Sequence, residues 1–152
     1  MRVFENPNEL LSHVGEDLGE TDWIEIDQAR INRFAEATGD HQWIHVDVER
    51  AKKGPYGGPI AHGYLTASLA NYFLPQLIDV RRVSMGVNYG CDKIRFPSPV
   101  PVGSKIRGLG TLTHAEETKD GGIQAKVTVK IEIADQERPA CIIETISRFY
   151  PE

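Results

Sequence analysis

The sequence predicts an α+β fold in which a curled antiparallel sheet of about five strands wraps around one apolar helix. Apolar and polar residues alternate from Ile123 to Ile133, which is typical of a strand with one buried and one solvated face. From about Gly63 to Leu77 little polar surface remains, as in a helix that is buried on all sides. We expect one domain over residues 1–152, because a chain of this length buries roughly 70% of its unfolded surface.

Helix signals dominate the first third of the chain. Asp27 and Asp47 are capping residues, and Gly39 is a helix stop. The elements expected are an amphipathic helix over residues 7–14, a strand over 23–26, a helix from Asp27 to Thr38, and a short helical turn from Asp47 to Lys52. Asp40 therefore lies directly beyond a helix end.

Strand signals dominate the second half. The expected strands cover residues 84–96, 105–114, 123–133 and 140–149, with a hairpin turn at 119–122. Gly108 and Gly110 fall on the same side of their strand as Ile106 and Leu112. A strand glycine on the buried side lets another segment come close, so the apolar helix is expected to approach the sheet here.

Composition excludes several classes of function. The net charge of -5 and the pI near 5.5 provide no field that would attract a nucleic-acid backbone. Cys91 and Cys141 lie far apart with no His or Cys at metal-ligand spacing, so neither a disulfide framework nor a zinc site is expected. No segment reads as a secretion signal, and no apolar run approaches the ~20 residues of a membrane span. We expect a cytoplasmic protein.

One stretch combines the groups that proton-transfer chemistry requires. Asp40 and His45 lie on one short irregular segment, and with ordinary pKa values near ~3.9 and ~6.5 both can accept a hydrogen bond from water at neutral pH. The glycine-rich run 57–63 leads into the apolar helix, whose first N–H groups are unpaired and favour developing negative charge. The sequence therefore predicts an enzyme.

Residues 34–45 and 57–63 resemble the signature of the MaoC-like, (R)-specific enoyl-CoA hydratases, also called hydratase 2, and residues 88–90 and 93–103 resemble that family's following strand and loop. The resemblance covers roughly residues 20 to 150. It implies the hot dog fold, a homodimer with two sheets joined edge to edge, and a hydro-lyase that adds water to trans-2-enoyl-CoA to give (3R)-3-hydroxyacyl-CoA. Asp40 and His45 would be the catalytic dyad, and the Gly63 N–H would bind the thioester oxygen. No metal or redox cofactor is implied, since coenzyme A enters only with the acyl-CoA substrate.

Three further residues are candidates for substrate binding. For His62 we favour a structural histidine with satisfied hydrogen bonds, whose backbone rather than ring lies near the chemistry. For Tyr64, as for Tyr72, we favour core packing over a place in an acyl pocket. Arg95 belongs to an alternating basic pattern that usually marks a solvated face, with phosphate binding as the alternative.

One departure from the resemblance concerns the loop that holds the dyad. Where the family commonly has Asn-Pro, this chain has Gln42-Trp43, which removes a fixed φ angle and adds a large ring.

Two other functions are compatible with the same residues. A hot dog acyl-CoA thioesterase would direct water at the thioester carbon instead of C3. A non-catalytic acyl-CoA-binding or partner subunit would keep the fold without the reaction.

Overall fold

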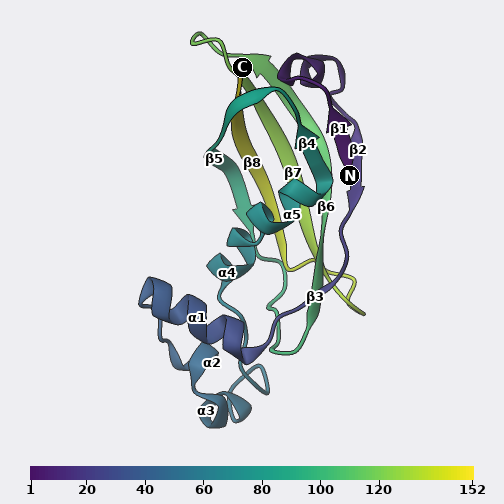
Figure 1. Cartoon of the computed structure of the whole chain (residues 1–152). Coiled ribbons are helices and arrows are strands. Elements are labelled where there is room, and N and C mark those ends of the chain that lie inside the picture. Colours follow the sequence, from purple (N-terminus) through teal and green to yellow (C-terminus); the bar gives the residue numbers. More distant parts are fainter.

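The structure is a computed structural model that describes residues Met1–Glu152. A six-stranded antiparallel sheet forms its body, with the order β2-β6-β7-β8-β5 and β3 paired with β6 (Figure 1). These strands are β2 (Asp17–Glu20), β3 (Ile24–Glu25), β5 (Val83–Arg95), β6 (Lys105–Glu117), β7 (Ile123–Ile133) and β8 (Cys141–Pro151). The four long strands confirm the four predicted in the second half of the sequence, and the α+β class is confirmed.

Two helices lie end to end against one face of this sheet, α4 (Gly63–Ser68) and α5 (Ala70–Leu77) (Figure 1). The face that they cover is apolar, because every second residue of β7 from Ile123 to Ile133 is buried. Phe73 and Leu77 of α5 are fully buried against it. Burial of this apolar surface is the main favourable term in folding the domain.

The helix approaches β6 closely where the sequence has glycine. A Cβ atom at Gly108 would lie 2.7 Å from Cβ and Cγ of Phe73, and one at Gly110 would lie 3.0 Å from a methyl group of Leu77. These separations are shorter than carbon atoms tolerate without displacement. The expected close approach of helix and sheet is thus confirmed at both glycines.

Several short segments of the chain differ from the prediction or were not predicted. Residues 7–14, predicted as an amphipathic helix, form instead a 3-10 helix, η1 (Pro7–Ser12). The strand β2 and a second, two-stranded parallel sheet, made by β1 (Arg2–Phe4) and β4 (Ile78–Val80), were not predicted. Segments of three or four residues are too short to show a period-2 pattern, so these strands depend on pairing with distant partners.

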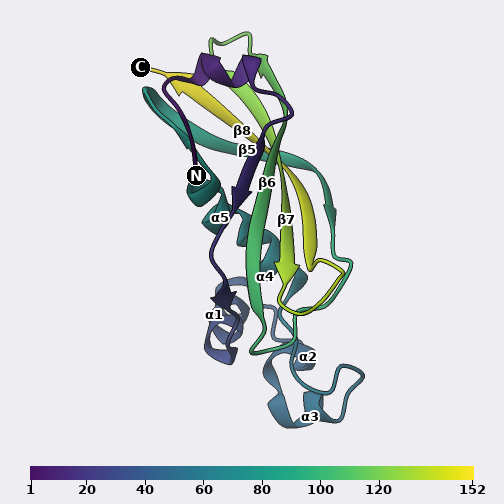
Figure 2. The ribbon, with the colours of Figure 1, turned by 90° about the vertical axis from the view of Figure 1, so that its right-hand side faces the viewer.

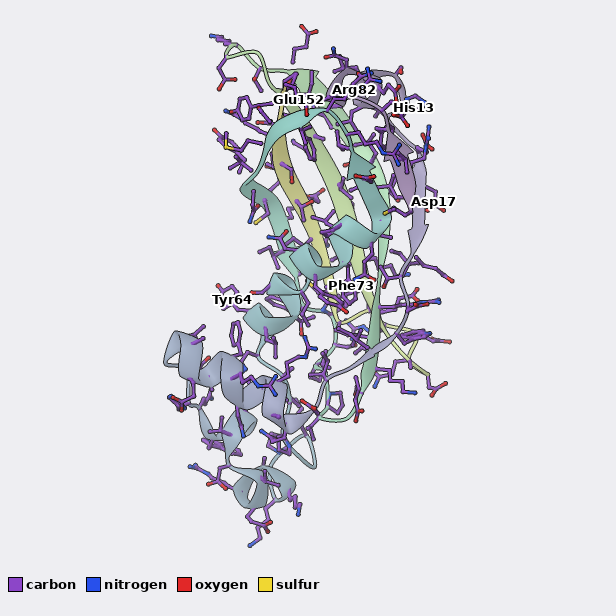
Figure 3. The ribbon with its side chains drawn as sticks, viewed as in Figure 1. His13, Asp17, Tyr64, Phe73, Arg82 and Glu152 are labelled. Carbon is purple, nitrogen blue, oxygen red and sulfur yellow. The ribbon has the colours of Figure 1, made fainter.

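The apolar helix differs from its prediction in two ways. It is divided at Leu69, and its apolar residues are not all buried. Tyr64 is 71% exposed and Tyr72 47% exposed, so the expectation that both pack in the core is wrong. Figure 3 labels Tyr64 on α4 and Phe73 on α5. The sheet leaves part of the helix pair uncovered, and both tyrosine side chains reach solvent there.

Three helices form a separate group at one end of the sheet, α1 (Gln28–Thr38), α2 (Trp43–Val46) and α3 (Val48–Lys52) (Figure 2). The side chain of Asp27 caps α1 and that of Asp47 caps α3, each by accepting a hydrogen bond from a backbone N–H three residues on. Both caps confirm the sequence signals. No helix of the protein combines the length and apolar character needed to cross a bilayer.

We predict that Gly108→Ala lowers the free energy of unfolding by about 1–3 kcal/mol, because the added methyl group must displace Phe73 in a packed core. Urea denaturation followed by circular dichroism measures the change. Gly58→Ala is the control, since nothing lies within 4 Å of a Cβ at Gly58. Equal stability of the two variants would contradict the packing described here.

Candidate active site

Asp40 is positioned by the end of α1. Gly39 adopts the left-handed conformation, with φ of 78°, and its N–H donates to the carbonyl of Ala35, which ends the helix. The Asp40 carboxylate then accepts a hydrogen bond of 3.3 Å from the N–H of Gln42. This local turn holds an exposed carboxylate at the start of the segment that leads to α2.

His45 is positioned by hydrogen bonds to segments that are distant in sequence. Its Nδ1 donates to the carbonyl of Ile60 at 2.7 Å, and its own carbonyl accepts from the Gln28 side chain at 2.8 Å. The ring is only 6% exposed. Because Nδ1 carries the proton that Ile60 binds, Nε2 of the neutral ring is left as a proton acceptor.

The His62 ring lies against the His45 ring. The two ring centroids are 3.9 Å apart with an interplanar angle of 24°, and His62 Nε2 donates to the backbone carbonyl of Asp40 at 3.0 Å. A nitrogen of each imidazole and a carboxylate oxygen of Asp40 all lie within 4.8 Å of one another. The structure therefore brings Asp40, His45 and His62 together.

The expectation for His62 was only partly right. The residue is buried, as a structural histidine would be, but its Nδ1 has no hydrogen-bond partner and its ring is in contact with His45. The hydrogen bonds are thus not satisfied, and the ring itself lies beside the proposed chemistry. His62 and His45 are 17 residues apart in the sequence, so no local pattern predicts this contact.

Burial lowers the pKa of His45 below its ordinary value of 6.5, and the neighbouring His62 lowers it further. The hydrogen bond to Ile60 and the Asp40 charge act in the opposite direction without reversing the shift. A depressed pKa keeps the imidazole neutral at neutral pH. His45 can then accept a proton, as general-base chemistry requires.

A cleft of about 310 Å³ opens beside His45. Its lining includes Gly63, Thr66 and Phe96, and six further hydrophobic residues complete most of its wall. The N–H of Gly63 donates to no acceptor of the protein. A Cβ at Gly63 would lie 3.2 Å from the Phe96 ring, so a side chain there would require the ring to shift. A residue with a free backbone donor at a helix start therefore lines the same cleft as His45.

The three clustered groups are of types that bind divalent metals, yet their geometry does not fit one ion. Metal ligation requires nitrogen lone pairs that converge on the ion, and each lone pair lies in the plane of its ring. Stacked rings hold their lone pairs in nearly parallel planes, so His45 and His62 cannot both point at one centre.

Two of the remaining candidates lie elsewhere. Tyr64 lines a different depression, between α4 and β5. Its ring meets that of Phe96 edge-on, with 6.2 Å between the ring centroids. Arg95 is exposed at the end of β5, next in sequence to Phe96 of the cleft, and forms no ion pair. Arg107, from the same basic pattern, is engaged by Glu20 and Glu132. Arg95 is therefore, unlike Arg107, a surface cation without a carboxylate partner.

The departure at Gln42-Trp43 has a structural explanation. The Trp43 ring packs on Gly54, where a Cβ would lie 3.0 Å from the ring, and the Arg50 guanidinium lies 4.3 Å above the ring centroid. The ring thereby ties α2 to α3 and the turn after it. Tertiary packing supplies the restraint that a proline would have supplied through its φ angle.

Two residues that hold the site were missed in the sequence. Ile60 contributes only its backbone, accepting from His45 Nδ1 and donating to the Ile44 carbonyl at 3.0 Å. Gln28 contributes its amide from the first turn of α1. Every residue has a backbone carbonyl, so the sequence does not show which one accepts the hydrogen bond from His45. A polar side chain in a helix first turn is too common to single out.

Comparison with known proteins identifies the family of this chain. The family described as MaoC like domain matches residues 9–136. Over 149 residues the chain is 46% identical to 3-hydroxyacyl-thioester dehydratase Z of Mycobacterium tuberculosis strain ATCC 25618 / H37Rv, covering 98% of this chain and 99% of that protein. It is also 42% identical over 144 residues to nodulation protein N of Rhizobium leguminosarum bv. viciae, covering 92% of this chain and 89% of that protein. The chain belongs to the MaoC-like dehydratase family.

The protein is accordingly an enzyme of the hydro-lyase class, a hydratase or dehydratase. Among solved structures, the (R)-hydratase from A. caviae involved in PHA biosynthesis superposes with a TM-score of 0.73 at 24% identity, covering 89% of this chain and 95% of that chain. This likeness concerns the fold and confirms the hot dog architecture that the resemblance implied.

We predict that the free energy of unfolding falls as the pH decreases below about 6.5, in part through His45. The pKa of His45 in the folded protein lies below its unfolded value. As the pH falls through the unfolded pKa, the unfolded chain therefore takes up the proton first, and the free energy of unfolding decreases. His45→Gln removes this group and should flatten that part of the profile. Urea denaturation between about pH 5 and pH 7.5 measures it. An identical slope in the variant would contradict the burial effect.

Proposed function

We propose that the protein is an (R)-specific enoyl-CoA hydratase, which adds water reversibly to trans-2-enoyl-CoA and forms (3R)-3-hydroxyacyl-CoA. The observation that carries the proposal is the approach of the Asp40 carboxylate to the buried His45 ring within 4.8 Å, with His45 lining the same cleft as Gly63. The identity to a 3-hydroxyacyl-thioester dehydratase supports a thioester substrate for this chain as well. The (R) product rests on the family resemblance.

The proton balance of hydration suits two basic groups. Hydroxide adds to C3 and a proton adds to C2, so one proton leaves water and one arrives at the substrate for each turnover. His45 Nε2 and the Asp40 carboxylate are both acceptors at neutral pH, and one bound water can donate to both. The pair accepts one proton and returns one, and its total charge is the same at the end of the cycle.

Negative charge on the thioester oxygen needs a donor, which we assign to the Gly63 N–H. This donor lacks an acceptor within the protein and belongs to the first turn of α4, where the helix dipole favours an anion. Removing one such donor typically costs ~3 to 4 kcal/mol of barrier. Of the other candidates for substrate binding, Tyr64 lies outside this cleft, and Arg95, next in sequence to Phe96 of the cleft, offers an unpaired cation for a substrate phosphate.

We further propose a homodimer that forms along β5. This 13-residue strand is the edge of the sheet, exposed along nearly its whole length, and it presents Met85, Val87 and Tyr89 to solvent. An open edge with apolar side chains is a template for pairing with a second strand. We place the protein in the cytoplasm, because both cysteines are free thiols.

A thioesterase would use the same cleft and carboxylate. The buried, neutral imidazole beside the carboxylate favours hydration, which needs a group that accepts a proton and a group that returns one. A non-catalytic subunit would bind the thioester without turnover.

Crotonyl-CoA discriminates among these functions. We predict that the purified protein removes the enoyl absorbance without releasing free thiol. Chiral analysis of the product then tests the (R) configuration, and a ladder of enoyl-CoA lengths reports the preferred acyl chain. Release of free thiol would identify a thioesterase instead. If the protein neither removes the enoyl absorbance nor releases thiol, it is a non-catalytic binding subunit.

We predict that Asp40→Ala and His45→Ala each lower kcat for crotonyl-CoA at least about a hundredfold, because each removes one proton-handling group. Circular dichroism verifies that both variants fold. His41→Ala is the matched control, since His41 adjoins Asp40 but is exposed and pairs with Glu36 on the surface. Near-normal kcat in either folded dyad variant would reject the assignment.

We predict that Val87→Asp combined with Tyr89→Asp converts the dimer to a monomer, because two carboxylates would face the partner's β5 across an apolar contact. Light scattering after gel filtration should show the mass falling from about twice 17.0 kDa to that value. Val14→Asp introduces a carboxylate near the opposite sheet edge and should leave the mass unchanged.

A further inference from the structure

His62 contacts both members of the proposed dyad. The residue precedes α4 and is 2% exposed. One ring nitrogen, Nε2, holds the Asp40 carbonyl at 3.0 Å, while the ring stacks on that of His45 with 3.9 Å between centroids. Phe34 of α1 packs against the same imidazole at 4.9 Å. Through one side chain, the end of α1, α2 and the start of α4 are joined.

The other ring nitrogen of His62 shows that packing alone does not explain the residue. Nε2 donates to the Asp40 carbonyl, and the other ring nitrogen, Nδ1, is buried without a hydrogen-bond partner. A buried polar atom that lacks a hydrogen bond destabilises the folded protein. An apolar ring of similar size would fill this space without that cost, so the imidazole must contribute something that such a ring does not.

We propose that His62 is a positioning residue, which sets the separation of the Asp40 carboxylate from the His45 ring by holding the Asp40 backbone through Nε2 and supporting the His45 ring with its face. The inference rests on the proposed hydration reaction. A water that must donate to both groups is bound productively over a narrow range of separations, and displacement by about 1 Å reduces turnover strongly.

Stacking also couples the charges of the two rings. The titratable groups around His45 are His62 from the segment before α4, Asp40 from the end of α1, and Tyr56, which lines the cleft. Of these, His62 lowers the pKa of His45 and Asp40 raises it. A neutral residue in place of His62 removes the lowering effect, and the pKa of His45 then rises.

Two variants separate the functions of the ring. His62→Phe keeps an aromatic face against His45 but has no N–H for the Asp40 carbonyl. His62→Gln keeps an N–H donor without a ring. We expect His62→Phe to lower kcat for crotonyl-CoA at least about tenfold with little change in KM, and His62→Gln to recover part of this loss. Thr21→Val is the control, because it removes a buried hydrogen bond to Gly108 far from the site and should keep the wild-type kcat.

The pH dependence distinguishes positioning from general stability. In both His62 variants the midpoint assigned to His45, measured by NMR titration of its ring, should move to higher pH, whereas Thr21→Val should leave it in place. A folded His62→Phe with full kcat and an unmoved midpoint would overturn the proposal. If His62→Phe does not fold, the same two measurements on His62→Gln decide the question. Turnover by the wild-type protein tests the hydratase function separately. If the wild-type protein has no activity, that function is rejected, and the NMR titration alone tests whether His62 shifts the His45 midpoint.

Discussion

The contact between α5 and β6 is the constraint on which the rest of the molecule depends. Phe73 occupies the space that a side chain at Gly108 would need, and this brings α5 down onto the sheet. Because α4 leads into α5, the same contact sets where Gly63 and His62 lie. The backbone amide and the imidazole beside the cleft thus take their positions from a packing contact in the core, at the other end of the helix pair.

The site is held chiefly through backbone carbonyls. Ile60 binds one nitrogen of His45, Asp40 binds one nitrogen of His62, and the His45 carbonyl is itself bound by Gln28. Each bond to a ring determines which nitrogen keeps its proton and therefore which nitrogen is free for chemistry. Burial lowers the pKa of His45 and keeps it neutral at neutral pH, while the Asp40 carboxylate is exposed. Two neighbouring groups acquire different properties because one is enclosed by the fold and the other faces solvent.

The elements that could be predicted are those whose signal is local and repeated. The strands β5 to β8 are each at least 11 residues long, β7 alternates between buried and more exposed residues along its whole length, and the caps at Asp27 and Asp47 act within three residues. The short strands β1 and β4 have no such pattern, because they exist only where they pair across 76 residues of chain. The exposure of Tyr64 was missed for a related reason: an aromatic residue signals a preference for burial, but only the surrounding structure decides whether enough neighbours are present to cover it.

The sequence by itself determined the types of chemistry available and their approximate places: a carboxylate after a helix stop, an imidazole a few residues later, and a glycine at a helix start. Helix ends follow from interactions among neighbouring residues, so they can be inferred without the fold. Only the tertiary structure decided that His62 stacks on His45, that Ile60 selects the free nitrogen, and that Trp43 replaces a proline by packing on Gly54. Stacking and hydrogen-bond geometry depend on how separate segments lie relative to one another, and local sequence preferences do not encode that placement.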